Sequence, residues 1–163
     1  MLAAVQDDLT VNPRQNAGCC SEPENAPDFR CCVANALRGL EGNISARNLT
    51  VLFSPPPERT EVGAEPNALY SAMSRFLGAA FAREDAGQRV ELIVWRSLSD
   101  VRMAMVTLAR PDGATHLRMA EGVDGEYFAA LAGLESLGCY ATLSTSPLAR
   151  HLLLILPAHT RAD

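Results

Sequence analysis

The sequence predicts an α/β (α+β) fold, a two-layer sandwich in which a mixed, mainly antiparallel sheet carries three helices on one face. Apolar residues recur at helical spacing in three separate segments, which predicts three amphipathic helices. Elsewhere apolar and polar residues alternate in short runs joined by turns, which predicts strands and a hairpin. Because these elements do not follow a regular βαβ repeat, a doubly wound parallel sheet is excluded. The 163 residues suffice for one domain with a sizeable core.

The first half of the chain supplies two of the helices and one strand. The first helix is predicted from an N-cap at Asp28 to a stop at Gly42. The run 48–53 alternates as a strand does and ends at three consecutive prolines, which cannot donate to a sheet ladder. A short edge strand is expected at 61–62. The second helix, over 66–84, begins at a proline and carries a wide apolar stripe.

The second half supplies a hairpin, a helix and a closing pair of strands. The alternating runs 89–96 and 101–109 are joined by a short polar turn, which is typical of a hairpin. A third helix is predicted over 125–137, and strands over 139–144 and 151–156. The residues of this helix that we expect to face the core are Phe128, Leu131 and Leu134.

Composition limits the classes of partner and compartment. The formal net charge of -5 argues against a nucleic-acid partner, because phosphate binding requires a basic face. No apolar run approaches the roughly 20 residues that span a bilayer. Residues 1–10 contain two aspartates and lack the basic start of a secretory signal. We therefore expect a cytoplasmic protein with neither a nucleic-acid nor a membrane partner.

The five cysteines do not predict a metal site or a disulfide framework. Four of them form the adjacent pairs 19–20 and 31–32, and neighbouring side chains point in different directions, so they converge poorly on one metal. An odd count in a cytoplasmic chain also disfavours disulfides. We expect Cys31, Cys32 and Cys139 to act as small apolar residues in or near the core.

Two segments carry a resemblance to a known family. The helix sequence NALYSAMSRFLGAAF (67–81), followed by the strand at 89–94, is similar to the asparagine-box helix of the catalytic ATP-binding domain of sensor histidine kinases. The stretch 131–157 resembles the last helix of that domain, its glycine turn, and its final two strands ending in Leu-Pro. The chain thus resembles a degenerate member of the GHKL (HATPase) superfamily, which includes gyrase and the MutL mismatch-repair proteins.

The resemblance implies a Bergerat-type ATPase fold and a division of the chain into three parts. Residues 28–157 would form the histidine-kinase-like ATPase domain. Residues 1–27 would be a linker and the remnant of a dimerisation helix, and 158–163 would be a tail.

The residues that bind magnesium and adenine in this family are not present at the matching positions. The family's second asparagine ligates the magnesium that bridges the ATP phosphates, and the box positions hold Arg75 and Ala79 here. A methyl group cannot coordinate a hard cation that requires oxygen ligands. The family's Asp-x-Gly-x-Gly motif contacts the adenine amine through its aspartate. Aligned by strand register, these places hold Thr107, Ala109 and Pro111.

Two glycine-containing segments offer partial substitutes. Asp112-Gly113 could replace the missing motif if the strand were longer, and a turn explains these residues equally well. In the phosphate lid Gly122 and Gly125 survive, but the neighbouring Asp124 and Glu126 would repel a triphosphate. We therefore expect no catalytic residue, no metal ligand and no cofactor, and we assign a vestigial ATP pocket to Arg75, Ala79, Thr107, Ala109, Asp112, Gly113, Gly122 and Gly125.

The remaining candidate groups favour ordinary surface roles. His116, His151 and His159 lack the His-Glu/Asp context of a kinase phosphoacceptor, so we expect them at the surface or at edges. The adjacent acids Glu84 and Asp85 are expected to solvate a helix end. The arginines spread from position 83 to 118 are expected to be solvated singly, and a patch for an acidic partner is the alternative.

The resemblance, together with the missing residues, implies a module for protein interaction or phosphorelay in two-component signal transduction. It would retain the scaffold to dock a response-regulator receiver domain, a histidine kinase or a second copy of itself. One alternative is an active, ATP-dependent protein histidine kinase domain that binds ATP and magnesium through Asp112 and residues 122–125. Another is a histidine phosphotransfer protein, phosphorylated on His116 or His151.

Overall fold

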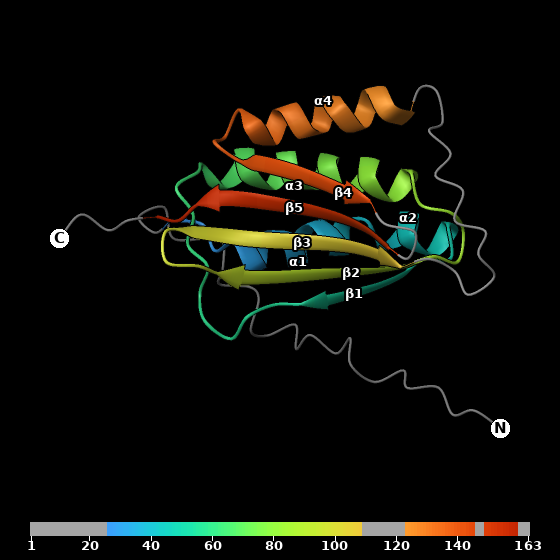
Figure 1. Ribbon diagram of the computed structural model, residues 1–163, viewed down its shortest axis with the longest axis horizontal. Coiled ribbons are helices and arrows are strands. Elements are labelled where there is room, and N and C mark those ends of the chain that lie inside the picture. Colours follow the sequence, from blue (N-terminus) through green and yellow to red (C-terminus); the bar gives the residue numbers. More distant parts are fainter. Residues whose placement is uncertain (1–25, 109–122, 146–148, 160–163) are drawn as a thin grey trace.

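The computed structural model describes residues 26–108, 123–145 and 149–159. In this part of the chain a five-stranded sheet lies in front of a layer of helices (Figure 1). The predicted two-layer α/β sandwich is therefore confirmed. The elements are α1 (Phe29–Gly39), α2 (Glu41–Ala46), β1 (Thr50–Ser54), α3 (Pro66–Ala82), β2 (Arg89–Arg96), β3 (Asp100–Leu108), α4 (Val123–Glu135), β4 (Tyr140–Thr145) and β5 (Ala149–Pro157).

The sheet is mixed and mainly antiparallel, as predicted. Its strand order is β1-β2-β3-β5-β4, and β1 pairs with β2 in parallel. The other three pairings are antiparallel. The predicted hairpin is β2–β3, in which Trp95 lies opposite Arg102. The central strand β3 then pairs with β5 along nine residues, which places the C-terminal strand inside the sheet and β4 at its edge.

Capping residues set the ends of the first helices. Asp28 caps α1, as predicted, and its carboxylate accepts a hydrogen bond from the backbone N–H of Arg30. The prediction that this helix continues to Gly42 is wrong. The N–H of Leu40 bonds to the carbonyls of Ala36 and Leu37, which ends α1 at Gly39, and Gly42 then lies inside the short helix α2.

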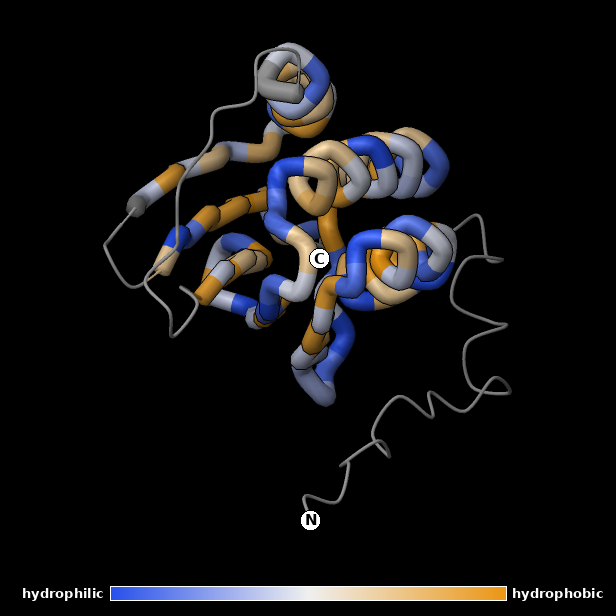
Figure 2. The backbone as a smooth tube through the Cα atoms, turned by 90° about the vertical axis from the view of Figure 1, so that its right-hand side faces the viewer, coloured by the Kyte–Doolittle hydropathy of each residue, from blue (hydrophilic) through white to orange (hydrophobic). Residues whose placement is uncertain are grey.

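Helix α3 is the best-anchored helix of the layer. Pro66 occupies its first turn, as predicted, and the Glu65 side chain accepts from the N–H groups of Asn67 and Ala68. Its apolar stripe packs between α1, α4 and the sheet (Figure 2). The most deeply buried side chains of the core include Phe29, Leu69, Phe76, Leu92, Met103, Leu134 and Leu154.

Helix α4 faces the core with a side that differs from the predicted one. Leu134 is fully buried and Leu131 packs against the core, but Phe128 is 56% exposed. Tyr127 is buried in its place, so the expectation for Phe128 is wrong by one residue. The helix is followed by Gly138, whose φ of 81° lies in the left-handed region that favours glycine.

The loops are tied to the layers by a few backbone contacts. The predicted edge strand at 61–62 consists of two isolated bridges, from Glu61 to Asp28 and from Val62 to Ala158. The His159 N–H also donates to the carbonyl of Glu61, 3.0 Å away. As expected, Cys32 and Cys139 are buried, whereas Cys31 is partly exposed. None of the helices described here is long and apolar enough to cross a membrane.

Candidate functional site

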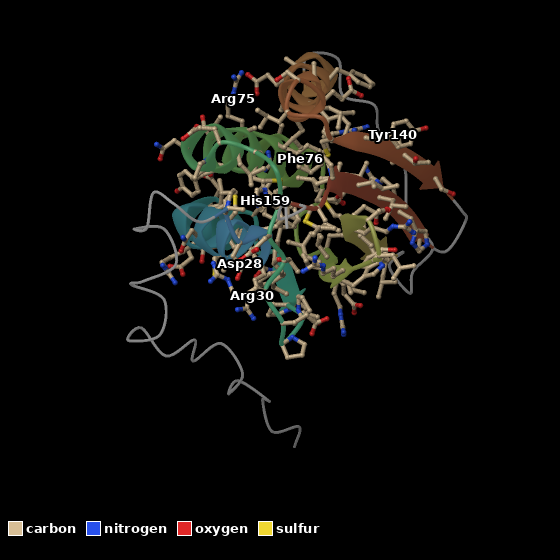
Figure 3. All side chains as sticks on the ribbon, turned by 90° about the vertical axis from the view of Figure 1, so that its left-hand side faces the viewer. Asp28, Arg30, Arg75, Phe76, Tyr140 and His159 are labelled. Carbon is tan, nitrogen blue, oxygen red and sulfur yellow. The ribbon has the colours of Figure 1, made fainter. Side chains whose placement is uncertain are left out.

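The structure describes four of the eight positions assigned to the vestigial pocket. Thr107 lines a cavity behind the sheet, and Ala79 is buried next to Ala80, which also lines it. Arg75 instead points outward from α3 (Figure 3), and Gly125 is exposed on α4. The other four, which lie outside the described residues, are Ala109, Asp112, Gly113 and Gly122.

The cavity lies between the C-terminal end of α3, strands β3, β4 and β5, and the start of α4. Its volume of about 20 Å³ is enough for about one water molecule. The cavity is therefore too small, as it stands, for an adenine ring. Its polar residues are Arg83, Glu84, Thr107, Tyr127 and Arg150, and its apolar wall is formed by Ala80, Met105, Leu143 and Leu152.

Glu84 lines this cavity with a buried carboxylate. The residue is 4% exposed, and the Thr107 hydroxyl donates to its Oε1 at 3.1 Å. Arg150 Nη2 lies 3.5 Å from its other oxygen, Oε2. Thr107 and Arg150 are directly opposite each other in the β3–β5 register, so the sheet itself holds both partners of Glu84 in place.

Tyr127 closes the side of the cavity next to α4. The Arg83 guanidinium carbon lies 4.2 Å from the centre of the tyrosine ring, within the range of a cation–π contact. The ring also packs against Phe76, with ring centres 5.7 Å apart. The last turn of α3 and the first turns of α4 are thus joined by one buried aromatic side chain.

The electrostatics of the site follow from its burial. Burial raises the pKa of Glu84, although Arg150 and the Thr107 hydrogen bond act in the opposite direction. Burial also raises the pKa of Tyr127. With Glu84 ionised, its single negative charge lies among two guanidinium groups, and Arg150 Nε has no hydrogen-bond partner among the described residues.

Sequence reasoning missed most of this arrangement. Glu84 was expected to solvate a helix end together with Asp85, and this is wrong for Glu84, whereas Asp85 is exposed. A signal was present, because position 84 follows Ala80 and Phe81 by four and three residues and so continues the inward stripe of α3. Arg150 gave no such signal, since it lies 66 residues from Glu84.

A second polar cluster, at the N-terminus of α1, has a structural role. Asp28 is 3% exposed and accepts from both the N–H and the hydroxyl of Thr60 and from Arg30 Nε at 2.8 Å. Arg30 also donates to the carbonyls of Pro56 and Pro57, which anchors the proline loop to the helix. Burial opposes ionisation, but these hydrogen bonds prevail and lower the pKa of Asp28.

Neither cluster offers a metal site. In the described ranges, no three His, Cys, Asp or Glu side chains converge as metal ligands do. Of the two candidate phosphoacceptors, His151 is exposed on β5 and His116 lies outside the described residues. The third histidine, His159, is exposed just beyond β5.

Comparison with solved structures identifies the fold. The chain superimposes on the catalytic domain of the histidine kinase ThkA with a TM-score of 0.62 at 10% identity, over 80% of this chain and 93% of that one. A mycobacterial sensor histidine kinase, MprB, gives a TM-score of 0.60 at 14% identity, covering 80% and 95% of the two chains. The histidine kinase AdeS of Acinetobacter baumannii gives 0.61 at 11% identity, covering 82% and 66%.

One of the similar structures was solved as an assembly. ThkA in complex with the response regulator protein TrrA superimposes with a TM-score of 0.56 at 12% identity, over 81% of this chain and 41% of that one. No protein-family model matches the sequence, and no curated protein matches it either. At these identities the likeness establishes the fold alone: this chain has the fold of histidine kinase catalytic domains, as the sequence resemblance implied.

Proposed function

We propose that this chain is a non-catalytic interaction module of two-component signalling, which keeps the histidine kinase catalytic fold and does not bind ATP. The observation that carries the proposal is the small size of the cavity, about 20 Å³. Side chains of the chain itself occupy the rest of the space between α3 and β3. ATP and magnesium are accordingly not cofactors in this proposal.

The contacts in the cavity support the loss of nucleotide binding. Thr107, at the position that resembles the purine-contacting aspartate, already donates its hydroxyl to Glu84. Admitting a nucleotide would require Tyr127 to leave both Phe76 and Arg83.

The partner we propose is the receiver domain of a response regulator. The ThkA–TrrA complex supports this choice, because a protein of the same fold there assembles with a response regulator. A packed scaffold can retain such a docking role after its pocket has lost its chemistry. The phosphorelay form of the proposal adds phosphate transfer to a histidine of this chain.

Titration with a fluorescent ATP analogue in the presence of magnesium tests the proposal. We expect no saturable binding, while an active histidine kinase catalytic domain, run as a positive control, binds under the same conditions. Saturable micromolar binding that is lost in Asp112→Ala would overturn the proposal and favour the active kinase alternative.

A second titration tests the partner. Purified receiver domains are added to the full chain with and without Mg-ATP, and we expect binding that does not depend on the nucleotide. Incubation with phosphorylated receiver domains, followed by detection of acid-labile phosphate, distinguishes the phosphorelay form. Label on His151 or His116 would support it, whereas label that requires ATP would contradict the non-catalytic proposal.

A further inference from the structure

One face of the sheet carries a cluster of apolar side chains that no described element covers, although Arg102 lies between Trp95 and Ile155. The helices all lie behind the sheet, and Figure 1 looks onto the opposite face; Figure 2 shows the same separation edge-on. In the strand register Ile93, Ala104 and Leu153 form one row across β2, β3 and β5. We call the surface formed by this row and its neighbours the open face, which consists of Ile93, Trp95, Ala104, Val106, Leu153 and Ile155.

The composition of the open face departs from that of a solvated sheet. An antiparallel sheet with one face in water normally alternates apolar residues inward with polar residues outward. In β5 both faces are apolar instead, since Leu152 and Leu154 are buried against the helices while Leu153 and Ile155 point to the other side. Ile93 is 39% exposed, and Tyr140 extends the face at the β4 edge with 65% exposure (Figure 3). Such a surface is typical of a buried interface.

The charges on this face are already neutralised within the chain. Arg89 lies 2.8 Å from Glu91, and Arg102 lies 2.7 Å from Asp100, each pair on one strand. These four residues sum to zero, although the whole chain carries a net charge of -5. A partner therefore needs no complementary charge here, and two copies of this face do not repel one another.

The area and the surface shape of this side of the sheet suit an interface with a second copy of the chain. At about 3.4 Å per residue and about 4.8 Å between strands, the whole outer side of the sheet, five strands of five to nine residues with the open face at its centre, presents about 600 Å². Two copies would bury about 1,200 Å², the lower end of the range for specific interfaces. In the central row the small Ala104 lies between Ile93 and Leu153, so it leaves a depression that can receive a large side chain from the facing sheet.

We propose that two copies of this chain pair through their open faces, sheet against sheet, to form a symmetric dimer. A two-fold axis through the open face, offset from Ala104, places the same apolar surface on both sides of the interface and lets each Ala104 meet a large side chain of the second copy. The two sheets then pack about 10 Å apart, as in β-sandwiches. This inference does not depend on whether the cavity behind the sheet binds a nucleotide.

Trp95 provides a local reporter, because it lies on the open face and is the one tryptophan of the sequence. Sedimentation of the full chain from micromolar to submillimolar concentration measures the mass, and acrylamide quenching of tryptophan fluorescence is followed over the same range. We expect the mass to rise from 17.5 kDa toward twice that value while quenching of Trp95 falls in parallel. A mass that stays monomeric throughout, or a dimer in which the quenching of Trp95 does not change, would overturn the proposal.

Charge insertion on the face provides the matched test. Leu153→Lys, and separately Ile93→Lys, are expected to keep the chain monomeric over the whole range, since each buries a lysine in the dimer. Both side chains point away from the core, and circular dichroism confirms the fold. Leu98→Lys, at the fully exposed hairpin tip, is the control and should dimerise as the parent does. Dimerisation of both face variants to the same extent as this control would also contradict the proposal.

Discussion

The hydroxyl of Thr107 donates a hydrogen bond to the buried carboxylate of Glu84, 3.1 Å away, in the cavity behind the sheet. The bond joins β3 to the end of α3 and leaves room for about one water molecule beside it. Thr107 and Glu84 thus satisfy one another, whereas Arg150 Nε has no hydrogen-bond partner in the part of the chain that the structure describes.

Glu84→Gln is expected to remove a specific pH dependence of stability. Burial raises the pKa of Glu84 above its ordinary 4.5, so the native state holds a proton there more strongly than the unfolded chain does. The stability from this group is fully present below pH 4.5 and is lost as pH rises through the raised pKa. The parent should therefore lose stability relative to the variant over that window, by at most about 1.4 kcal/mol per pH unit.

Urea unfolding of both proteins at a series of pH values measures this difference. Asp85→Asn is the matched control, because it removes the neighbouring carboxylate, which is exposed. If the difference in unfolding free energy between the parent and Glu84→Gln does not change with pH above 4.5, burial does not raise the pKa of Glu84.

Tyr127→Ala should destabilise the fold by about 3–5 kcal/mol, the usual cost of removing a buried aromatic side chain. The substitution removes the contact with Phe76 and the ring under Arg83. Tyr127→Phe keeps both ring contacts and should cost about 1 kcal/mol. Phe128→Ala, on the exposed neighbour, is the control and should stay within about 0.5 kcal/mol. Equal losses of stability in Tyr127→Ala and Phe128→Ala would contradict the burial of Tyr127 and the exposure of Phe128.

Placing an acid at position 107 should not create nucleotide binding. In Thr107→Asp two carboxylates would meet in a buried site, and we expect a loss of about 2–5 kcal/mol at neutral pH with no binding of Mg-ATP. Thr107→Ser keeps the hydroxyl donor and should cost less than about 1 kcal/mol. Thermal unfolding with and without Mg-ATP measures both effects. A ligand-dependent rise in the Tm of Thr107→Asp would show that the cavity opens readily.

Asp28→Ala should weaken the anchoring of the proline loop. It removes the cap of α1 and leaves the Thr60 hydroxyl and N–H without their buried acceptor, at a cost of about 2–4 kcal/mol. Because the pKa of Asp28 is lowered from 3.8, its stabilising effect is present above that pH and is lost as pH falls through the lowered value. Asp28→Asn keeps a cap acceptor and should recover part of the loss in urea unfolding at pH 7. Equal stability of Asp28→Ala and the parent would show that Asp28 does not stabilise the start of α1 and the proline loop.

Local pattern was enough to predict the layers of this fold. The hairpin β2–β3 follows from period-two alternation, and α3 follows from its stripe and from Pro66, because both signals are contained in one segment. The end of α1 was predicted too late, since Gly42 allows a stop but the hydrogen bonds of Leu40 set one earlier. Helical periodicity also could not decide between the adjacent Tyr127 and Phe128, which are both aromatic.

The candidate site was less predictable, because it joins residues that are distant in sequence. The family resemblance indicated Thr107, which lines the cavity, and Ala79, which is buried on α3 next to the lining residue Ala80. The groups that fill it, Glu84 and Arg150, meet only once β5 pairs with β3. A register of this kind is set by the packing of the whole sheet rather than by any local motif.

Titration of the isotope-labelled chain with Mg-ATP, followed by backbone amide NMR, tests the central claim most directly. A filled cavity predicts no saturable shift changes at Thr107, Tyr127 or Arg150 as the nucleotide is added. Saturable changes centred on these three residues would show that the cavity admits the nucleotide and would contradict the account.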